Sequence, residues 1–180
     1  MSDIRLVLVS CCAPCSAGAI RQLADGAIPN VSDFIVLFFN PNIYPADEYQ
    51  KRLAEQIKYC QACGVKYAVG DYNHDEWRDA MRGMENEPER GARCSQCFKF
   101  RFRFAHQFAR EHGYNAIASV LGVSRHKSQD QVDDAAASVC DGNVCYVPIK
   151  WDEKLRTDIG RASDFYRQNY CGCEFSIRKI

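Results

Sequence analysis

The hydrophobic and polar positions of this chain alternate between short apolar runs and longer segments with a helical pattern. The apolar runs predict buried strands at residues 4–9, 34–39, 65–69, 116–123 and 144–149. The segments of helical periodicity or composition predict helices at residues 17–23, 46–63, 75–84, 94–112, 129–139 and 159–167. Because strands and helices take turns along the chain, we expect an α/β fold with a mainly parallel sheet and helices on both faces.

One segment carries two conflicting periodicities. Phenylalanines at positions 98, 100, 102 and 104 alternate with basic residues, which by itself is typical of a half-buried strand. A strand there would leave the parallel sheet without a crossover helix, and residues 105–112 have a helical composition. The topology therefore favours a helix over residues 94–112.

The composition is that of a globular protein with a single domain, which we expect to span residues 1–180. Hydrophobic residues make up 47% of the chain, and 23 basic side chains balance 23 acidic ones. The zero net charge gives no global attraction to polyanions, so any nucleic-acid contact must use a local patch. No apolar run approaches the roughly 20 residues of a membrane-spanning helix, and the N-terminus lacks a signal-peptide pattern. We expect a cytoplasmic protein without a membrane partner.

Cysteine is the residue that sets this chain apart. It contains 11 cysteines, an odd number that excludes complete pairing into intramolecular disulfides. In a reducing compartment, clustered thiols more often bind metal or carry out redox chemistry than form structural disulfides. The positions of the cysteines therefore indicate the chemistry of the protein.

The first cysteine group lies where a predicted strand turns into a predicted helix. Residues 10–16 read Ser-Cys-Cys-Ala-Pro-Cys-Ser. Ligands of open α/β sheets gather at the carboxyl ends of strands, where the N–H groups of the next helix favour negative charge such as that of thiolates. Two adjacent cysteines in a turn cannot both point into one apolar core, so packing alone does not account for this group.

Two more groups lie at element ends. Cys94 and Cys97 form a C-x-x-C motif, whose spacing suits a metal or cluster site and also a thiol redox pair. Cys171 and Cys173 flank one glycine and form a flexible dithiol that could hold a metal or close into an easily reduced disulfide. The others are expected to be structural: Cys60 and Cys63 within an apolar-faced helix, and Cys140 and Cys145 on either side of a turn.

The number of cysteines in the three groups bears on the kind of site. A structural zinc ion would take four thiolates and leave the rest unexplained. A [4Fe–4S] cluster also takes four, and the remaining thiols can then relay electrons or hold a second ion. The surplus therefore favours redox chemistry over a structural metal.

Four separated motifs occur in a fixed order along the chain. They are Cys-Cys-Ala-Pro-Cys-Ser at 11–16, Phe-Asn-Pro-Asn-Ile-Tyr-Pro at 39–45, Glu-Asn-Glu-Pro at 85–88 before Arg-Cys-x-x-Cys-Phe, and Tyr-Arg-Gln-Asn-Tyr-Cys-Gly-Cys at 166–173. Together they resemble the cobalamin-independent epoxyqueuosine reductases, the QueH family, and residues 121–127 match a looser pattern of that family. The resemblance implies a Rossmann-like, HUP-like fold with a metal site at the carboxyl ends of the strands.

The resemblance also implies a reaction and its partners. Members of this family reduce epoxyqueuosine in tRNA to queuosine, the last step in making that modified base. The expected partners are therefore a tRNA carrying epoxyqueuosine at the anticodon wobble position and an electron donor that the sequence does not identify.

Roles for individual residues follow from the same resemblance. The implied ligands of a [4Fe–4S] cluster are Cys11, Cys12, Cys94 and Cys97. The implied redox-active, disulfide-forming pair is Cys171 with Cys173, and the C-terminal segment 166–176 is expected to fold back to the metal site. The family is also associated with one additional metal ion, iron or another divalent metal, for which Cys15 and a nearby carboxylate are candidate ligands.

Turning an epoxide into an alkene requires two electrons, two protons and stabilisation of the departing oxygen. Proton donors must come from loops at the same edge of the sheet, and the candidates near predicted strand ends are His126, Tyr44 and Asp71. Each also has a structural interpretation, and Asp71 in particular is placed to cap the helix that starts near His74.

A basic stretch around the second cysteine pair is the candidate tRNA contact. Its members are Arg90, Arg93, Lys99, Arg101 and Arg103, interleaved with phenylalanines. This combination suits phosphate contact and base stacking. The alternative is that the phenylalanines belong to the core and the basic residues form an ordinary solvated face.

Two other functions remain open. An adenylating tRNA-thiolation enzyme shares the alternating plan and the C-x-x-C motifs, but it needs a Ser-Gly-Gly-x-Asp-Ser phosphate loop where this chain has Ser-Cys-Cys-Ala-Pro-Cys-Ser. A non-catalytic zinc-binding module for RNA or protein would need only the C-x-x-C pair and the basic stretch. The identity of the bound metal separates that module from the reductase.

Overall fold

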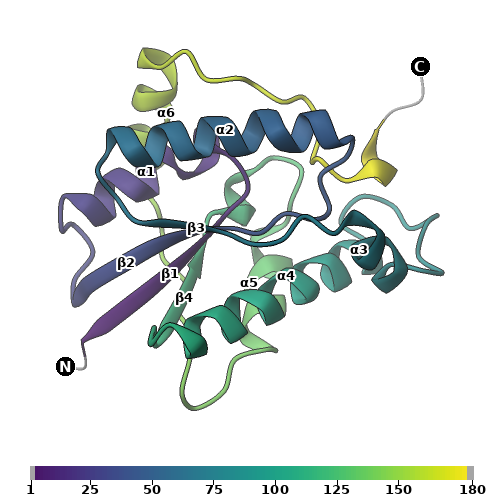
Figure 1. Ribbon diagram of the computed structural model, residues 1–180, viewed down its shortest axis with the longest axis horizontal. Coiled ribbons are helices and arrows are strands. Elements are labelled where there is room, and N and C mark those ends of the chain that lie inside the picture. The colour runs from purple at the N-terminus through teal and green to yellow at the C-terminus, as the bar shows by residue number, and fades with distance from the viewer. Residues whose placement is uncertain (1–2, 178–180) are drawn as a thin grey trace.

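The computed structural model describes residues 3–177 and confirms the expected α/β fold (Figure 1). A five-stranded parallel sheet has the order β3-β2-β1-β4-β5. Its strands are β1 (Ile4–Ser10), β2 (Val31–Phe38), β3 (Tyr67–Val69), β4 (Ala116–Ser119) and β5 (Cys145–Tyr146). The helices are α1 (Ala13–Ala24), α2 (Ala46–Ala62), α3 (His74–Ala80), α4 (Ala92–Glu111), α5 (Gln129–Ala137) and α6 (Glu153–Ala162), with 3₁₀ turns η1 (Leu121–Val123) and η2 (Glu174–Ser176).

The central strand β1 is buried on both faces and separates two apolar cores. Leu6 and Leu8 pack against α1 and α2, whereas Val7 and Val9 pack against α4 and α5. Figure 1 shows these two pairs of helices above and below the sheet. Successive side chains of a strand point to opposite faces, so a continuous apolar run is what a strand covered on both sides requires.

The strand order creates a crevice beside the carboxyl end of β1. The chain winds outward from β1 through β2 to β3 and then returns to pair β4 with the other edge of β1. The loops that follow β1 and β4 therefore lead to opposite faces of the sheet, and the gap between them is where open α/β sheets bind ligands. The cysteine-rich turn at 10–16 and the segment 121–127 are these two loops.

The segment with conflicting periodicities is helical, as the topology argument predicted. Phe98 and Phe102 lie four residues apart and are fully buried in the core, while Phe100 and Phe104 form a second such pair that stacks on Phe39. Two interleaved pairs at helical spacing thus produce the apparent period of two. At 20 residues α4 is the longest helix. No helix within residues 3–177 is long and apolar enough to cross a membrane.

Several predicted boundaries were wrong near the end of the chain. The last helix begins at Glu153 instead of residue 159, because the carboxylate of Asp152 caps it by accepting a hydrogen bond from the Leu155 N–H (2.9 Å). The predicted strand 116–123 ends at Ser119 and continues as η1. The predicted strand 144–149 is reduced to two residues, and Pro148, which has no N–H to donate, prevents further pairing.

The close contact of α6 with α1 gives a test of this packing. A Cβ added at Gly18 would lie 2.9 to 3.0 Å from the Cβ and backbone atoms of Arg156, whereas nothing lies within 4 Å of one added at Gly160 on α6. We expect Gly18→Ala to lower the free energy of unfolding by about 1 to 3 kcal/mol through overpacking. Gly160→Ala should raise it by up to about 1 kcal/mol through helix propensity. Urea unfolding measures the free energy of unfolding of both variants. Equal changes in the two variants would contradict the close packing of α6 on α1.

Candidate metal centre

The first cysteine group forms a compact cluster of three thiols. Cys11 lies in the turn after β1, Cys12 occupies the N-cap position of α1 with an extended backbone, and Cys15 lies in the first helical turn. The three sulfur atoms all lie within 4.8 Å of one another. Pro14 suits the first turn of a helix, where its missing N–H leaves no hydrogen bond unmade. The turn therefore brings three potential metal ligands to the N-terminal end of a helix.

Buried polar side chains fix the conformation of this turn. The Asn40 side-chain amide, which follows β2, donates a hydrogen bond to the Ser10 carbonyl oxygen (2.9 Å). The hydroxyl groups of Ser10 and Ser16 both donate to Oε1 of Gln56 on α2, at 2.7 and 3.0 Å. All four side chains are buried. The turn is thus held from both neighbouring segments, which limits the freedom of its thiols.

The C-x-x-C pair lies in the first turns of α4, and each of its sulfurs receives a hydrogen bond. The Trp77 indole Nε1 donates to the Cys97 sulfur (3.3 Å), and the Arg90 backbone N–H donates to the Cys94 sulfur (3.3 Å). Trp77 is completely buried on α3. Donors aimed at sulfur favour the negatively charged thiolate over the thiol.

The C-terminal cysteines lie beside both other groups. Cys173 packs in one cluster with Cys97 and Trp77, and its backbone pairs with Ile43 in an isolated antiparallel bridge. Cys171 lines the same cleft as the three thiols of the first group. The cleft has a volume of about 860 Å³. Residues from three distant parts of the sequence therefore meet at one edge of the sheet.

Three buried cations face these cysteines without any carboxylate partner. The exposed fractions of Arg93, Arg101 and Lys127 are 3%, 1% and 7%, and none forms an ion pair with a carboxylate within residues 3–177. The Lys127 Nζ lies 3.7 Å from the Cys11 sulfur. Nη1 of Arg101 is buried and has no hydrogen-bond partner in the described part of the chain. Buried cations require compensating negative charge, and thiolates are the available anions here.

The protonation of the thiols follows from these neighbours. Hydrogen bonds from the thiols of Cys12 and Cys15 lower the pKa of Cys11, and Lys127 and Arg101 add to this effect. The hydrogen bond to Cys11 correspondingly raises the pKa of Cys15 to about 12, and burial raises the pKa of Cys97 to about 11. Cys11 is therefore the thiol most ready to act as a thiolate, while the others release their protons when a metal binds.

The donor set fits a soft, thiolate-binding metal or an iron–sulfur cluster. All the ligand atoms that converge here are cysteine sulfurs, which select zinc, copper(I) and iron–sulfur clusters over hard cations. Arg93, Arg101 and Lys127 would place positive charge next to the anionic complex that the thiolates form with a metal. Cys94 and Cys97 are not within the 4.8 Å group of the first three thiols, so the four-cysteine ligand set implied by the sequence stays a prediction.

The three candidate proton donors differ in position. His126 lines the cysteine cleft, with Nδ1 3.3 Å from Oε1 of Glu89. Tyr44 stacks on His74 at 5.2 Å between ring centroids, and Asp71 lines a different hollow beside Phe39 and Phe104. Asp71 does not cap α3, because the Asn73 side chain accepts the capping hydrogen bond from the Glu76 N–H.

The basic stretch on α4 was misinterpreted in part. Arg93 and Arg101 are buried and donate to main-chain carbonyl oxygens, so they cannot contact phosphates at the surface. Phe98 and Phe102 are core residues and are not available for base stacking. The helix turns these residues inward because its apolar face covers the sheet.

Other basic residues, which the predicted tRNA contact did not include, line the cysteine cleft. They are Arg52, Arg125, Arg156 and Arg167, together with Lys127, and the only acidic residue among the lining residues is Glu153. Three of them lie within the family motifs at 121–127 and 166–173, whereas Arg52 on α2 and Arg156 on α6 have no motif, and only the fold brings all five together. Trp77 was missed for the same reason, since it lies 20 positions before its partner Cys97.

Comparisons with known proteins match almost the whole chain to one family. The family model described as epoxyqueuosine reductase QueH matches residues 6–179. The epoxyqueuosine reductase QueH of Histophilus somni is 37% identical over 180 residues, covering 97% of this chain and 72% of the relative. The epoxyqueuosine reductase QueH of Acinetobacter baylyi is 36% identical over 180 residues, covering 97% and 81%.

Solved structures share the fold at low sequence identity. The U34-tRNA thiolase NcsA from Methanococcus maripaludis with its [4Fe-4S] cluster superposes with a TM-score of 0.62 at 14% identity, over 99% of this chain and 63% of that chain. A predicted tRNA methyltransferase subunit from Methanocaldococcus jannaschii gives a TM-score of 0.56 at 10% identity, over 88% of this chain and 76% of that chain. These likenesses establish the architecture of the sheet and its helices.

Metal titration tests the three-thiol cluster directly. We expect the metal-free chain to bind Cd²⁺ with a sulfur-to-metal charge-transfer band in the ultraviolet. Cys15→Ser should weaken Cd²⁺ binding by roughly tenfold or more. Loss of a metal ligand lowers metal affinity at least as much as loss of a residue that hydrogen-bonds to a ligand. Cys145→Ser is the control, since Cys145 is exposed on β5. Equal affinities of the two variants would contradict the assignment.

Proposed function

This chain belongs to the QueH family of epoxyqueuosine reductases, and from that premise we propose how its cysteine cleft converts epoxyqueuosine to queuosine in tRNA. The reaction opens two C–O bonds of an epoxide and leaves an alkene. The oxygen departs as water after uptake of two electrons and two protons. The observation that carries the proposal is the cleft in which the three thiols of the first turn and the Cys171 thiol meet the buried Lys127.

We assign a [4Fe–4S] cluster to Cys11, Cys12, Cys94 and Cys97. When bound, such a cluster supplies electrons one at a time. Arg93, Arg101 and Lys127 support the assignment, because an anionic cluster would provide the negative charge that these buried cations lack. Hydrogen bonds from Trp77 and from the Arg90 N–H to the sulfurs of Cys97 and Cys94 would further stabilise the ligating thiolates.

The Cys171 and Cys173 thiols are the proposed source of the electron pair. Their oxidation to a disulfide releases two electrons and two protons, which is the number that the epoxide consumes. The disulfide is then reduced by an external thiol or electron-carrier protein, which makes the cycle catalytic. Cys171 supports this role because it lines the cleft beside Cys11 and Cys12.

Cys15 and His126 have separate proposed roles in the same cleft. Cys15 does not belong to the four proposed cluster ligands, so its thiol is available to bind an additional iron or other divalent ion. Glu153, the carboxylate that lines the cleft, is the second candidate ligand of that ion. His126 is the candidate proton donor for the departing oxygen, because it alone of the three candidates lines this cleft.

The positive charge of the cleft suits a polyanionic substrate. Five basic side chains and one acidic side chain line it, although the whole chain has no net charge. Arg125 and Arg167 are exposed at its edge, where they can contact the phosphates of an anticodon loop. We therefore place the tRNA backbone over these arginines and the modified base next to the cysteines. We propose a cytoplasmic location for the enzyme, because this chemistry needs reduced thiols.

Anaerobic reconstitution followed by turnover tests the proposed function. We expect about four irons per chain with acid-labile sulfide, a visible absorption band that bleaches with dithionite, and conversion of epoxyqueuosine to queuosine in tRNA. Cys94→Ser should lose both the cluster and turnover. Cys145→Ser, which changes an exposed cysteine on β5, should keep both.

A different metal content would reject this function. A colourless protein that holds one zinc, contains no sulfide and resists reconstitution lacks the proposed centre that passes electrons one at a time, and a zinc-binding module would then replace the reductase. Turnover by a Cys94→Ser protein at the wild-type rate would reject the ligand assignment.

Salt dependence tests the proposed tRNA contact. Arg125→Ala should weaken tRNA binding and reduce the slope of log affinity against log salt concentration by about 1, because one phosphate contact is lost. KM for tRNA should rise with little change in kcat. Arg161→Ala is the matched control, since Arg161 is exposed on α6 but does not line the cleft. Identical salt slopes for the two variants would contradict the placement of the tRNA.

A further inference from the structure

One of the basic residues that line the cysteine cleft belongs to a buried ion pair. Glu48 and Arg52 are four residues apart on α2, and Arg52 Nε lies 2.7 Å from Glu48 Oε1. Their side chains are 7% and 1% exposed. Glu48 is the only acidic residue among the buried residues of the described chain. A buried ion pair contributes little to stability, because the cost of desolvating the two charges offsets their attraction. The role of this pair is therefore to be found in the other hydrogen bonds that its members make.

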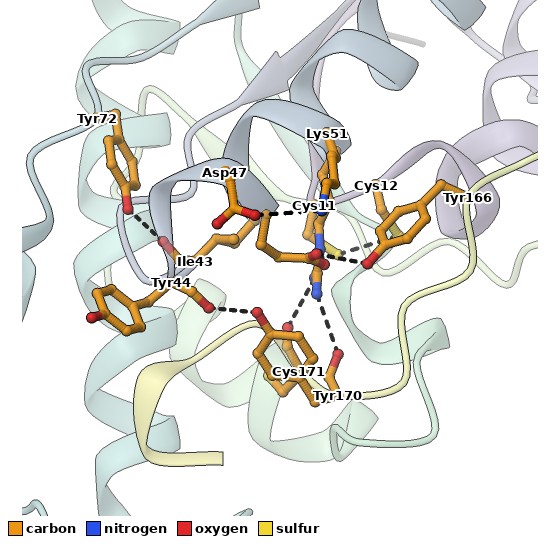
Figure 2. A network of polar contacts seen from close by, with 12 residues as sticks. Cys11, Cys12, Ile43, Tyr44, Asp47, Lys51, Tyr72, Tyr166, Tyr170 and Cys171 are labelled. Atoms are coloured by element: carbon orange, nitrogen blue, oxygen red, sulfur yellow. Dashed lines mark hydrogen bonds and ion pairs between the residues drawn. The ribbon is translucent and has the colours of Figure 1, made fainter. Parts of the chain in front are cut away.

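The remaining N–H groups of Arg52 bind the C-terminal segment. Nη1 donates to the Cys171 carbonyl oxygen (3.2 Å) and Nη2 to that of Tyr170 (3.4 Å). The guanidinium also lies 5.3 Å from the centroid of the Tyr170 ring. Figure 2 shows Tyr170 and Cys171 beside this network, with Cys11 and Cys12 behind it. One side chain thus holds two successive carbonyl groups, the second of which belongs to a cysteine of the proposed dithiol.

Other contacts complete the attachment of the segment 166–173. Glu48 Oε2 accepts a hydrogen bond from the Tyr166 hydroxyl (2.7 Å). The Tyr44 N–H donates to the Gly172 carbonyl oxygen (2.8 Å), and the Tyr170 hydroxyl donates to the Tyr44 carbonyl oxygen. Figure 1 shows the chain after α6 running alongside α2 toward the N-terminal end of that helix. The segment is therefore fixed on both sides of the dithiol.

Gly172 is required for this contact. Its φ of +109° is one that residues with a side chain rarely adopt. A Cβ there would lie 2.9 Å from Arg52 Nη1 and 3.1 Å from Ile43 Cγ1. The glycine between the two cysteines thus lets the guanidinium approach the backbone that carries them.

We propose that Arg52, oriented by Glu48, is a positioning residue that holds the Cys171–Gly172–Cys173 backbone at the cysteine cleft. The inference rests on the proposed redox role of this dithiol and adds the residue that places it. Arg52 reaches the dithiol through main-chain carbonyls, so it fixes where the thiols lie without taking part in electron transfer. Lysine cannot replace it, because a single ammonium cannot bind Glu48 and two carbonyl groups in the geometry of a guanidinium fork.

The test compares Arg52→Lys, which keeps a cation beside Glu48, with Lys58→Ala on the exposed side of the same helix. Iodoacetamide should label Cys171 of the reconstituted Arg52→Lys enzyme roughly tenfold faster than Cys171 of the wild type. The reason is that the segment is no longer restrained by hydrogen bonds from a charged guanidinium. Its kcat should fall while KM for tRNA, iron content and the visible spectrum stay unchanged. Lys58→Ala should match the wild type in every measurement.

Gly172→Ala gives an independent second variant, because it keeps both residues of the Glu48–Arg52 pair and instead forces the guanidinium and the segment apart with a Cβ that would lie 2.9 Å from Arg52 Nη1. It should reproduce the faster labelling and the lower kcat. Wild-type labelling of Cys171 in both variants would overturn the proposal, and so would faster labelling with unchanged turnover if Cys171→Ser inactivates the enzyme. Wild-type turnover by Cys171→Ser would show that the dithiol does not have the proposed redox function. That result would leave the labelling comparison, which reports the position of the segment, unaffected.

Discussion

The structure depends on a charge imbalance in its interior. Arg93, Arg101 and Lys127 are buried next to cysteines, and no carboxylate among residues 3–177 pairs with them. Burying a cation without a negative partner is costly, and the main-chain carbonyl groups that bind Arg93 and Arg101 offset only part of that cost. Thiolates would supply the missing negative charge, and binding a soft metal or cluster is a chemical means of deprotonating several cysteines together. The same charges make the metal-binding state the electrostatically favoured one.

The fold explains how distant cysteines come together at one edge of the sheet. The parallel sheet brings the turn after β1 and the loop after β4 to its central crevice, and the segment that leads into α4 contacts the loop after β4 through a hydrogen bond from Arg90 to the Arg125 carbonyl oxygen. The C-terminal segment then reaches the same place through contacts with α2 and Ile43. The architecture resembles that of a tRNA thiolase at 14% identity, which establishes the fold alone. The chemistry therefore has to be argued from the site itself, and here from the cysteines of the first turn.

Sequence reasoning reached the sheet, most helices and the cysteine groups because these leave local signals. The run 4–9 and the turn at 10–16 can be recognised without knowing what packs on them. Contacts between distant residues left no such signal: Lys127 beside Cys11, Trp77 beside Cys97 and Arg52 beside Cys171 are visible only once the chain is folded. Arg101 was assigned to the surface because its neighbours are basic, whereas the helix turns it into the core.

We propose that the cysteines of the first turn and of α4 together hold a redox cluster. Anomalous X-ray diffraction at the iron edge, from crystals of the anaerobically reconstituted protein, locates such a cluster. We expect one compact iron peak bounded by the sulfurs of Cys11, Cys12, Cys94 and Cys97. A single zinc ion bound by Cys11, Cys12 and Cys15, with Cys94 and Cys97 unligated, would contradict it.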